Sequence, residues 1–388
     1  MERKSRNSLF ISEILVISVL GVGCVSSDPT AAETQKPAQH VSPAAEIETV
    51  AIDDTVSVEA EPAVMPGTPV IRHGDEIVAA GRFFRTGTPV ALWLDETGYD
   101  GYRVERRFSP WVESDWETSR AATPSLTSPN RYSLRSATLT PAEREQHRSG
   151  RWSLAELQQV VDQVVLHYDA SGTSRQCFER LHDDRGLSIH FMVDVDGTIY
   201  QTLDLKEKAW HATTANSRSI GIEIAQVGAY ASPNADIFEQ WYRSNEAGGV
   251  QLAIPAEAHP DSVRNQSFSG QPARSELITG EINGQQLWQY DLTPEQYRAL
   301  AHLVATLHSV FPRIALDSPR DEAGEVRQDT LSPAEWTSFS GVLGHYHVQS
   351  NKIDPGPALQ WDLILDIAKE LLDNAESESP SAASTEPE

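Results

Sequence analysis

The chain has 388 residues and carries 31 Lys and Arg against 56 Asp and Glu, which gives a formal net charge of −25 at pH 7. A chain of this length can bury a substantial core in one large domain with a smaller region beside it. The acidic balance argues against nucleic-acid binding, since cationic patches supply the affinity for phosphate backbones.

The N-terminus has the pattern of a secretory signal. Basic residues within the first six positions precede an apolar run over residues 14–22, and Gly23 and Cys24 follow it. Cleavage before Cys24 would leave an acylated cysteine in first place, as in a bacterial lipoprotein, although Gly21 and Glu13 depart from the usual lipoprotein pattern. An ordinary signal peptide and an uncleaved anchor are the alternatives, but the uncharged run is shorter than the roughly 20 residues of a membrane-spanning helix. We therefore predict a signal peptide over residues 1–24 with lipidation at Cys24.

Lipidation at Cys24 would place the folded part on the periplasmic side of a bacterial cell envelope. The expected anchor is in the outer membrane, and secretion is the alternative. Residues 25–65 are rich in Ala, Thr, Pro and Glu, which predicts a disordered linker. Residues 373–388 repeat that composition and predict a disordered acidic tail.

Residues 66–149 are interpreted as a small β-rich N-terminal region with a connector. Apolar runs over 76–80, 83–85 and 90–94 alternate with turn residues, which is typical of short strands. The polar stretch over 110–149 has scattered Trp residues and is interpreted as the connector to the next domain.

Residues 150–372 alternate strands and helices, which predicts an α/β domain with a central mixed β-sheet flanked by helices. The continuous apolar run over 163–167 predicts a strand buried on both faces. Three further strands are expected, namely 188–193 and 198–201, paired about Asp196-Gly197, and 219–224.

Two helices are expected later in this domain. Thr293, Pro294 and Gln296 have the pattern of a helix start, with Thr as the N-cap and Gln at position N3. Apolar residues then recur at helical spacing and should face the sheet, namely Tyr297, Leu300, Val304, Leu307 and Phe311. Pro357 is expected to open the last helix, with a comparable stripe at Leu359, Leu363, Ile367 and Leu371.

The segment from 344 to 357 brings an imidazole, an ammonium and a carboxylate close together, at His345, Lys352 and Asp354. Such a segment can supply half of a catalytic zinc site, and His167 at the end of a buried strand can supply the missing ligand. Two imidazoles and one carboxylate leave the fourth tetrahedral position of Zn²⁺ open for water, as in catalytic rather than structural sites.

Each of these residues also has a structural explanation. A histidine at a strand end, such as His167, is often a hydrogen-bonded core residue, and Lys352 can be a surface lysine. His347 is a rival to His345 as a metal ligand. Cys177 is interpreted as a core residue of a helix and His190 as structural, since neither shows a metal-ligand pattern.

Four sequence blocks occur in a fixed order across roughly residues 150–372. They are Val-Leu-His-Tyr at 165–168, Ser-Ile-His-Phe-Met-Val with Asp-Gly-Thr-Ile-Tyr-Gln at 188–201, Ala-Trp-His-Ala with Asn-Ser-Arg-Ser-Ile-Gly-Ile-Glu at 209–223, and the segment 345–357. With these blocks the chain resembles the zinc-dependent N-acetylmuramoyl-L-alanine amidases of type 2, a family that shares its fold with peptidoglycan recognition proteins.

The resemblance implies a Zn²⁺ cofactor held by His167, His345 and Asp354. It also implies that Glu223 is the general base, which later delivers its proton to the departing amine. Lys352 would then aim its ammonium at the developing oxyanion.

The substrate implied by the resemblance is peptidoglycan or a muropeptide, cut at the amide between N-acetylmuramic acid and L-alanine in wall degradation, remodelling or recycling. Trp210, His211 and Asn216 are expected to line the groove and contact glycan or peptide, with a core position as the equal alternative for Trp210. A non-catalytic peptidoglycan-binding module of the same fold is the alternative, and a zinc peptidase acting elsewhere in the wall peptide is a third hypothesis. We expect a monomer.

The stretch from about 228 to 290 interrupts the family pattern and is interpreted as a surface insertion at the rim of the site. Its aromatic residues either form a groove wall that stacks on sugar rings or pack the insertion onto the domain; they are Phe238, Trp241, Tyr242 and Trp288. If they form a groove wall, replacing the insertion by a short Gly/Ser linker is expected to leave zinc content intact but to reduce activity on polymeric peptidoglycan more than on a small muropeptide. Equal loss on both substrates, or loss of folding, would favour the packing role.

Overall fold

The computed structural model describes residues 66–378, apart from 125, 136–138, 149–151 and 246–247. The chain divides into two units, Met1–Thr68 and Pro69–Glu388, and the fold is that of the second unit. The predicted signal peptide, its Cys24 and the linker over 25–65 lie outside the described residues.

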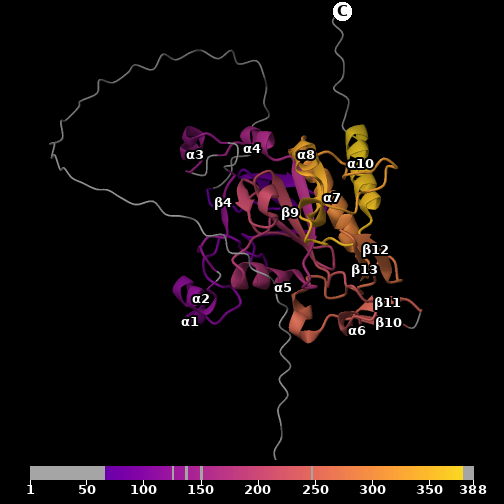
Figure 1. The fold of residues 1–388 in the computed structure, drawn as a ribbon. Coiled ribbons are helices and arrows are strands. Elements are labelled where there is room, and N and C mark those ends of the chain that lie inside the picture. Colours follow the sequence, from indigo (N-terminus) through magenta and orange to yellow (C-terminus); the bar gives the residue numbers. More distant parts are fainter. Residues whose placement is uncertain (1–65, 125, 136–138, 149–151, 246–247, 379–388) are drawn as a thin grey trace, which may run out of the picture. The chain divides into compact units, whose positions relative to one another are not determined.

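A mixed six-stranded sheet forms the centre of the second unit (Figure 1). Its strands, in spatial order, are β14 (Gly341–Gly344), β5 (Gln163–Tyr168), β9 (Ser219–Ile224), β6 (Phe191–Val193), β7 (Ile199–Gln201) and β3 (Val90–Leu92). All neighbouring pairs are parallel except β6 and β7, which are antiparallel. The predicted mixed sheet is therefore confirmed.

The N-terminal strands do not stand apart from this sheet. β3 pairs with β7 as an edge strand, while β1 (Glu76–Ala79) and β2 (Arg82–Arg85) form a separate antiparallel pair. The connector contributes β4 (Tyr132–Leu134), which pairs with β8 (Glu207–Ala209). Apolar runs predicted that strands form here, but not which sheet they join, because their partners are distant in the sequence.

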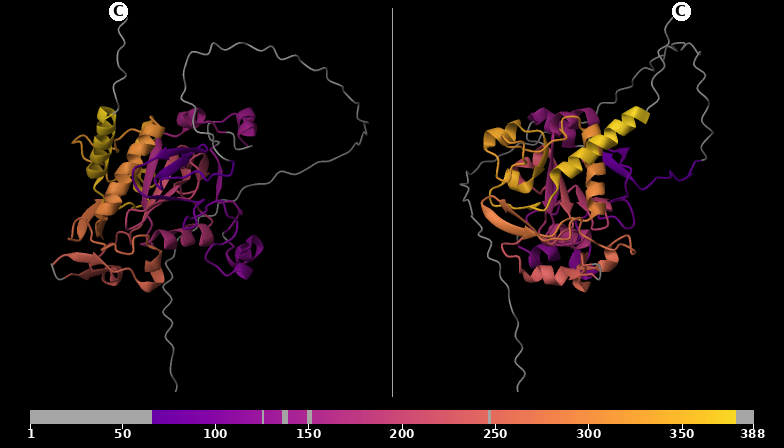
Figure 2. Two further views of the ribbon diagram at one scale, coloured as in Figure 1. Left: turned by 180° about the vertical axis from the view of Figure 1, so that it is seen from behind. Right: turned by 90° about the vertical axis from the view of Figure 1, so that its right-hand side faces the viewer.

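Two long helices lie side by side over one face of the sheet, α7 (Pro294–Val310) and α10 (Trp361–Glu378) (Figures 1 and 2). Their apolar residues form the largest core cluster together with alternate strand residues such as Leu166 and Ile222. On the opposite face, Cys177 of α5 (Ser174–Phe178) packs with Met192. Cys177 is buried, as predicted for a core residue.

The start of α7 agrees with the prediction from sequence. The hydroxyl of Thr293 accepts a hydrogen bond from the backbone N–H of Gln296 at 3.1 Å, and the Gln296 side chain accepts one from the Thr293 N–H at 3.0 Å. This reciprocal cap satisfies two N–H groups that a helix start leaves without partners.

Three predictions about the last helix and the tail after it were wrong. α10 begins at Trp361, not at Pro357, and it extends to Glu378, so the tail predicted to be disordered from 373 starts as helix. Its buried stripe consists of Trp361, Ile364, Leu365 and Ala368, whereas Leu363 is 39% exposed. The predicted stripe advanced by four residues at each step, and such a row drifts away from the buried face of a helix with 3.6 residues per turn.

Shorter elements connect this framework. The remaining α-helices are α1 (Trp111–Ser114), α2 (Trp116–Ala122), α3 (Pro141–Arg148), α4 (Leu154–Val160), α6 (Asp236–Trp241), α8 (Pro333–Ser338) and α9 (His345–Val348). One π-helical turn covers Glu179–Asp184, and 3₁₀ turns cover Thr213–Ser217, Ala256–Ala258 and Pro260–Ser262. The antiparallel hairpins are β10 (Tyr242–Ser244) with β11 (Val250–Leu252) and β12 (Ile278–Ile282) with β13 (Gln285–Gln289).

The insertion over 228–290 contains α6 and both of these hairpins. Phe238, Trp241 and Tyr242 are buried in a hydrophobic cluster of their own, and Trp288 is partly buried against it. The three buried rings cannot stack on a sugar in solution, and Trp288 has much of its surface covered by the cluster. The structure thus favours the packing alternative for these aromatic residues over a groove wall.

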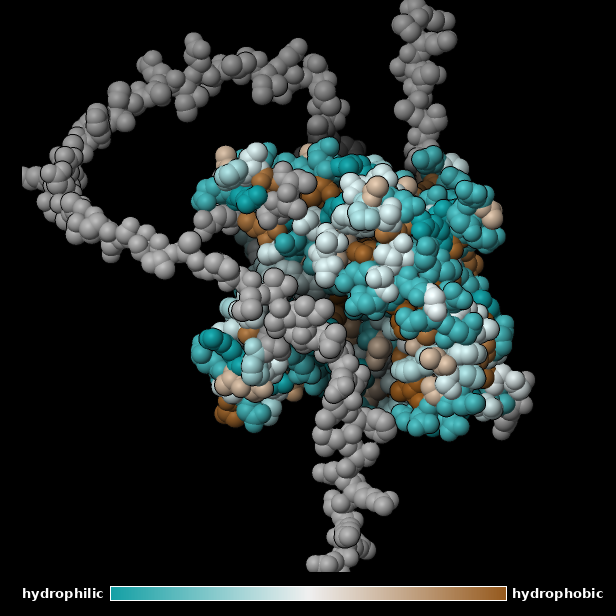
Figure 3. All heavy atoms as spheres, in the orientation of Figure 1, coloured by the Kyte–Doolittle hydropathy of each residue, from teal (hydrophilic) through white to brown (hydrophobic). Residues whose placement is uncertain are grey.

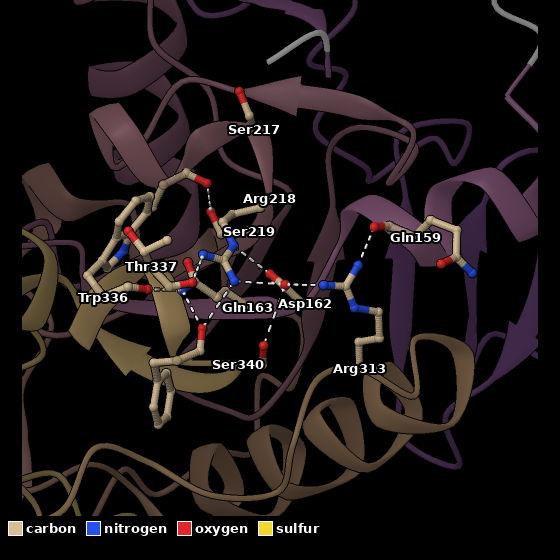
Figure 4. A network of polar contacts seen from close by, with 12 residues as sticks. Gln159, Asp162, Gln163, Ser217, Arg218, Ser219, Arg313, Trp336, Thr337 and Ser340 are labelled. Carbon is tan, nitrogen blue, oxygen red and sulfur yellow. Dashed lines mark hydrogen bonds and ion pairs between the residues drawn. The ribbon is translucent and has the colours of Figure 1, made fainter. Parts of the chain in front are cut away.

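Asp162, immediately before β5, links the starts of three strands (Figure 4). Its carboxylate accepts hydrogen bonds from Arg218 Nε and Nη2 at 2.7 and 2.8 Å and from Arg313 Nη2 at 2.9 Å. Arg218 precedes β9 and also donates to the backbone oxygen of Phe339, ahead of β14, at 3.2 Å. Because the Asp162 side chain is only 3% exposed, water screens these pairs less than it screens surface ion pairs. The network fixes β5, β9 and β14 relative to one another.

The face of the molecule in Figure 3 is largely hydrophilic, with hydrophobic residues in small groups. The exposed large apolar side chains include Trp111 and Val112 of α1. Within the part of the chain that the structure describes, no helix has an apolar stretch long enough to cross a membrane.

Candidate metal centre and active site

Strand register places three of the predicted residues at one end of the sheet. His167 of β5 pairs with Glu223 of β9, and Gly344 at the end of β14 pairs with Leu166. Paired residues of neighbouring parallel strands point to the same face, so the side chains of His167 and Glu223 project together. His345 follows Gly344 as the first residue of α9. In Figure 1, α4 before β5 lies at the upper end and α5 after it at the lower end, which is also where the insertion elements β10 and β11 lie.

Three candidate ligand atoms converge at this end of the sheet. His167 Nδ1 and His345 Nδ1 each lie 2.9 Å from Asp354 Oδ2. The three residues have ligand atoms within 4.8 Å of one another, and they are the one such group of His, Cys, Asp and Glu among the described residues. Two imidazole nitrogens and a carboxylate oxygen are a donor set typical of catalytic zinc. The structure thus brings together the three candidate ligands indicated by the sequence.

The second ring nitrogen of each histidine is also bonded. His345 Nε2 lies 2.8 Å from Gln349 Oε1, and His167 Nε2 lies 3.0 Å from His211 Nδ1. An amide oxygen only accepts, so the contact with Gln349 suits the tautomer of neutral His345 with its proton on Nε2, and in that tautomer Nδ1 has a lone pair for a metal. Partners of this kind fix the tautomer and the ring orientation of metal-binding histidines.

The protonation states of this group also suit a metal. Burial, together with the neighbouring His345, lowers the pKa of His167 to about 4. Burial alone would raise the pKa of Asp354, but His345 and His167 outweigh it and hold this pKa well below its usual value. At neutral pH His167 is then neutral and Asp354 is ionised, which are the forms that bind metal ions. The three residues fit Zn²⁺.

Glu223 lies next to this group with an unpaired oxygen. Its side chain is buried, and its Oε2 has no hydrogen-bond partner among the described residues. Burial, followed by the negative charges of Asp354 and Asp169, raises the pKa of Glu223 well above its usual value. Leaving a buried carboxyl oxygen without a partner is costly, so this position suits a bound water or substrate group with which Glu223 exchanges a proton.

Lys352 lies on the same loop as Asp354 and is half-buried. Its backbone N–H donates to the Gln349 oxygen at 3.0 Å. Its positive charge lowers the pKa of both His167 and Glu223, by less than the effect of the other charges named for each group.

Comparison with known proteins identifies the family. The family model described as N-acetylmuramoyl-L-alanine amidase matches residues 157–357, slightly more than half of the chain. The chain belongs to this amidase family. The resemblance stated from the four sequence blocks is therefore confirmed.

Several solved amidase structures are similar at low identity. A crystal structure of a selenomethionine derivative of AmpD is 15% identical with a TM-score of 0.27, over 61% of this chain and 89% of that one. AmiD from E. coli, in complex with the substrate anhydro-N-acetylmuramic acid-L-Ala-D-γ-Glu-L-Lys, is 17% identical with a TM-score of 0.29, over 53% and 57%. LysC from Clostridium intestinale URNW is 14% identical with a TM-score of 0.28, over 56% and 88%. A search of curated proteins gave no match.

The structure decides between the two candidate ligands of the last amidase block. His347 is fully buried, and its Nδ1 accepts a hydrogen bond from the Gly344 N–H at 2.9 Å. Its Nε2 donates to the backbone oxygen of Arg327 at 2.7 Å. Both ring nitrogens are thus occupied by backbone groups, which favours His345 over His347 as the candidate ligand of this segment.

The three residues expected to contact substrate in this amidase are held by the protein itself. His211 reaches Ser219 Oγ at 3.3 Å through Nε2, in addition to its contact with His167. Asn216 Oδ1 accepts from the His211 backbone N–H at 3.2 Å, and Trp210 Nε1 donates to a serine of β4 at 3.1 Å. His211 therefore contacts the candidate ligand His167 at Nε2, the ring nitrogen that does not face Asp354. A substrate-binding role for the three residues stays a prediction.

Gly221, in the middle of the Ser-Ile-Gly-Ile-Glu run, makes room for Ile189 and His211. A Cβ atom at this position would lie 2.5 Å from Ile189 Cδ1 and 2.6 Å from His211 Nδ1, closer than real Cβ contacts allow. The Gly221 N–H donates to His190 Nδ1 at 3.0 Å, and His190 Nε2 donates to the backbone oxygen of Glu207 at 3.0 Å. His190 is thus structural, as predicted.

Two contacts to the candidate ligands were not predicted from the sequence: that of Gln349 with His345 and that of His211 with His167. Gln349 lies four residues after His345, a spacing that puts both side chains on one face of a helical turn, and this signal was readable. The contact between His211 and His167 has no local signal, because the two residues come from separate segments that meet only when β9 pairs with β5.

Proposed function

We propose that this protein is a zinc-dependent N-acetylmuramoyl-L-alanine amidase. It hydrolyses the amide between the lactyl group of N-acetylmuramic acid and the L-alanine of the stem peptide, in peptidoglycan or in released muropeptides. The observation that carries the proposal is the convergence of His167, His345 and Asp354 beside the unpaired oxygen of Glu223, in a chain of the amidase family.

The residues of the site divide the chemistry among them. Zn²⁺ held by the three ligands would supply Lewis-acid activation of water and of the amide carbonyl. Glu223 takes a proton from the attacking water and delivers it to the alanine nitrogen as the C–N bond breaks. Lys352 places its ammonium where the carbonyl oxygen gains negative charge. The products are a lactyl carboxylate on the sugar and a peptide with a free L-alanine amine.

Digestion of purified sacculi tests this proposal. Mass spectrometry of the soluble products should show stem peptides that begin with L-alanine and glycan without peptide, and a chelator should suppress both. Peptides cut between amino acids would instead support a zinc peptidase. Binding to sacculi without any product would support the non-catalytic module.

We further propose that the amidase is tethered to the bacterial envelope through acyl chains on Cys24. The proposal rests on the apolar run over 14–22 and on Gly23 and Cys24 after it. Mature protein should carry lipid on Cys24 and fractionate with membranes, and Cys24→Ser should release it to the soluble fraction. A Cys24→Ser variant that stays fully membrane-bound would point to an uncleaved anchor.

A further inference from the structure

The second hairpin of the insertion contacts the loop that carries Lys352 and Asp354. This ligand loop, residues 349–358, has no strand and no helix of its own. We propose that Asn283 and Gln289 of the β12–β13 hairpin are positioning residues that hold the ligand loop in its metal-binding conformation. The inference rests on the proposed zinc site and assigns part of its construction to the insertion.

The hairpin is locally well defined. Asn283 and Gly284 form its two-residue turn with φ of 48° and 75°, the left-handed values that an Asn-Gly hairpin turn adopts. Ile282 and Leu287 on the two strands are 0% and 1% exposed and belong to the main core cluster. The hairpin is therefore anchored to the domain and can serve as a fixed support.

The first contact is to Lys352, two residues before Asp354. Asn283 Nδ2 donates to the backbone oxygen of Lys352 at 2.8 Å. Asn283 Oδ1 accepts from the N–H of Thr330 at 2.8 Å, and the Thr330 hydroxyl donates to the backbone oxygen of Tyr346 at 2.8 Å. One side chain thus connects the ligand loop to the helical turn that bears the other ligand of this segment.

The second contact lies immediately after Asp354. Gln289 is 1% exposed; its Nε2 donates to the backbone oxygen of Pro355 at 3.0 Å, and its Oε1 accepts from the N–H of Ala358 at 3.0 Å. Gly356 has a φ of 86°, and a Cβ atom there would collide with the Gln289 side chain. Only a glycine in this conformation lets the loop close around the Gln289 amide.

The two contacts bracket Asp354 on both sides. Asp354 itself is also held, because its backbone oxygen accepts a hydrogen bond from the N–H of Tyr346 in α9 at 3.1 Å. A metal ion binds more tightly when its ligands are already held near their binding geometry. Residues that hydrogen-bond to the ligand segment hold the ligands in this way. These contacts argue against the expectation that a short linker in place of the whole insertion would leave zinc binding intact.

Zinc affinity of two variants tests the inference. Gln289→Leu removes both amide contacts at similar size, and Asn283→Gly removes a side chain while a glycine keeps the left-handed turn. Each should weaken zinc binding about 10- to 100-fold in chelator competition, the usual effect of losing a supporting partner. Excess zinc should restore most of the activity, because the catalytic groups are unchanged.

Gln286→Ala is the matched control on the same hairpin. Gln286 is exposed and bonds within the hairpin to Thr279 and Gly280, so this variant should bind zinc like the wild type. Thermal unfolding of the zinc-free proteins shows whether each variant folds. If Gln289→Leu does not fold, the zinc affinity of Asn283→Gly alone tests the inference. Wild-type zinc affinity in a folded Asn283→Gly and Gln289→Leu pair would overturn the inference. A wild-type protein that binds zinc but cuts no muramoyl amide would overturn the proposed function alone.

Discussion

Replacing His345 and Asp354 together by alanine is expected to abolish stoichiometric zinc binding and, with it, amide hydrolysis. The wild type should hold about one Zn²⁺ per chain, because three protein ligands leave a fourth tetrahedral position for water. The double variant keeps only His167, and one imidazole cannot retain the ion against a chelator. Elemental analysis of dialysed protein measures the zinc content directly.

A control variant for this experiment also loses one imidazole and one carboxylate, but at positions outside the metal centre. His308→Ala with Asp366→Ala deletes one imidazole on α7 and one exposed carboxylate on α10, both outside the metal centre. This control should keep its zinc. Full zinc in the His345→Ala, Asp354→Ala protein would remove the ligand assignment, and His347 offers no replacement because backbone groups occupy both of its nitrogens.

Glu223→Gln is expected to keep the zinc and the fold while lowering turnover by about 10²- to 10⁴-fold, the usual contribution of a general acid–base group. The amide has nearly the size of the carboxylate but cannot take up the proton of the attacking water. Release of muropeptides should be measured alongside zinc content. Near-normal release from the Glu223→Gln variant would assign Glu223 to structure.

The same substitution has a predictable effect on the stability of the zinc-free protein. Because the pKa of Glu223 is raised above its ordinary value of 4.5, the folded protein loses stability as the pH rises from that value toward the folded-state pKa. An amide at this position does not ionise and causes no such loss, so the zinc-free Glu223→Gln protein should be at least as stable as the wild type at neutral pH. Thermal unfolding at pH 4 and pH 7 measures the difference.

Much of the framework could be predicted because its signals are local. The continuous apolar run before His167 and the alternating run before Glu223 both became buried strands of the central sheet. The Thr293 cap formed as predicted, because a capping box needs only residues three positions apart. The start of α10 was wrong, since the proline taken as its first residue lies in the preceding loop.

The supports of the site could not be predicted in the same way. Gln289 meets the ligand loop 66 residues further along the chain, and nothing near Gln289 in the sequence marks that contact. The Asn283-Gly284 pair is a strong hairpin signal that the sequence interpretation left unused. Even if the hairpin had been recognised, the sequence would not have shown that it contacts the ligand loop, because packing of the folded core decides which loop it supports.

Hydrolysis of a defined N-acetylmuramoyl peptide in water labelled with ¹⁸O tests the central claim most directly. The account predicts one ¹⁸O atom in the lactyl carboxylate of the muramic acid and an unlabelled peptide with a free L-alanine amine, with no product from Glu223→Gln on the same time scale. Label in a carboxylate of the peptide, or binding without any labelled product, would contradict it.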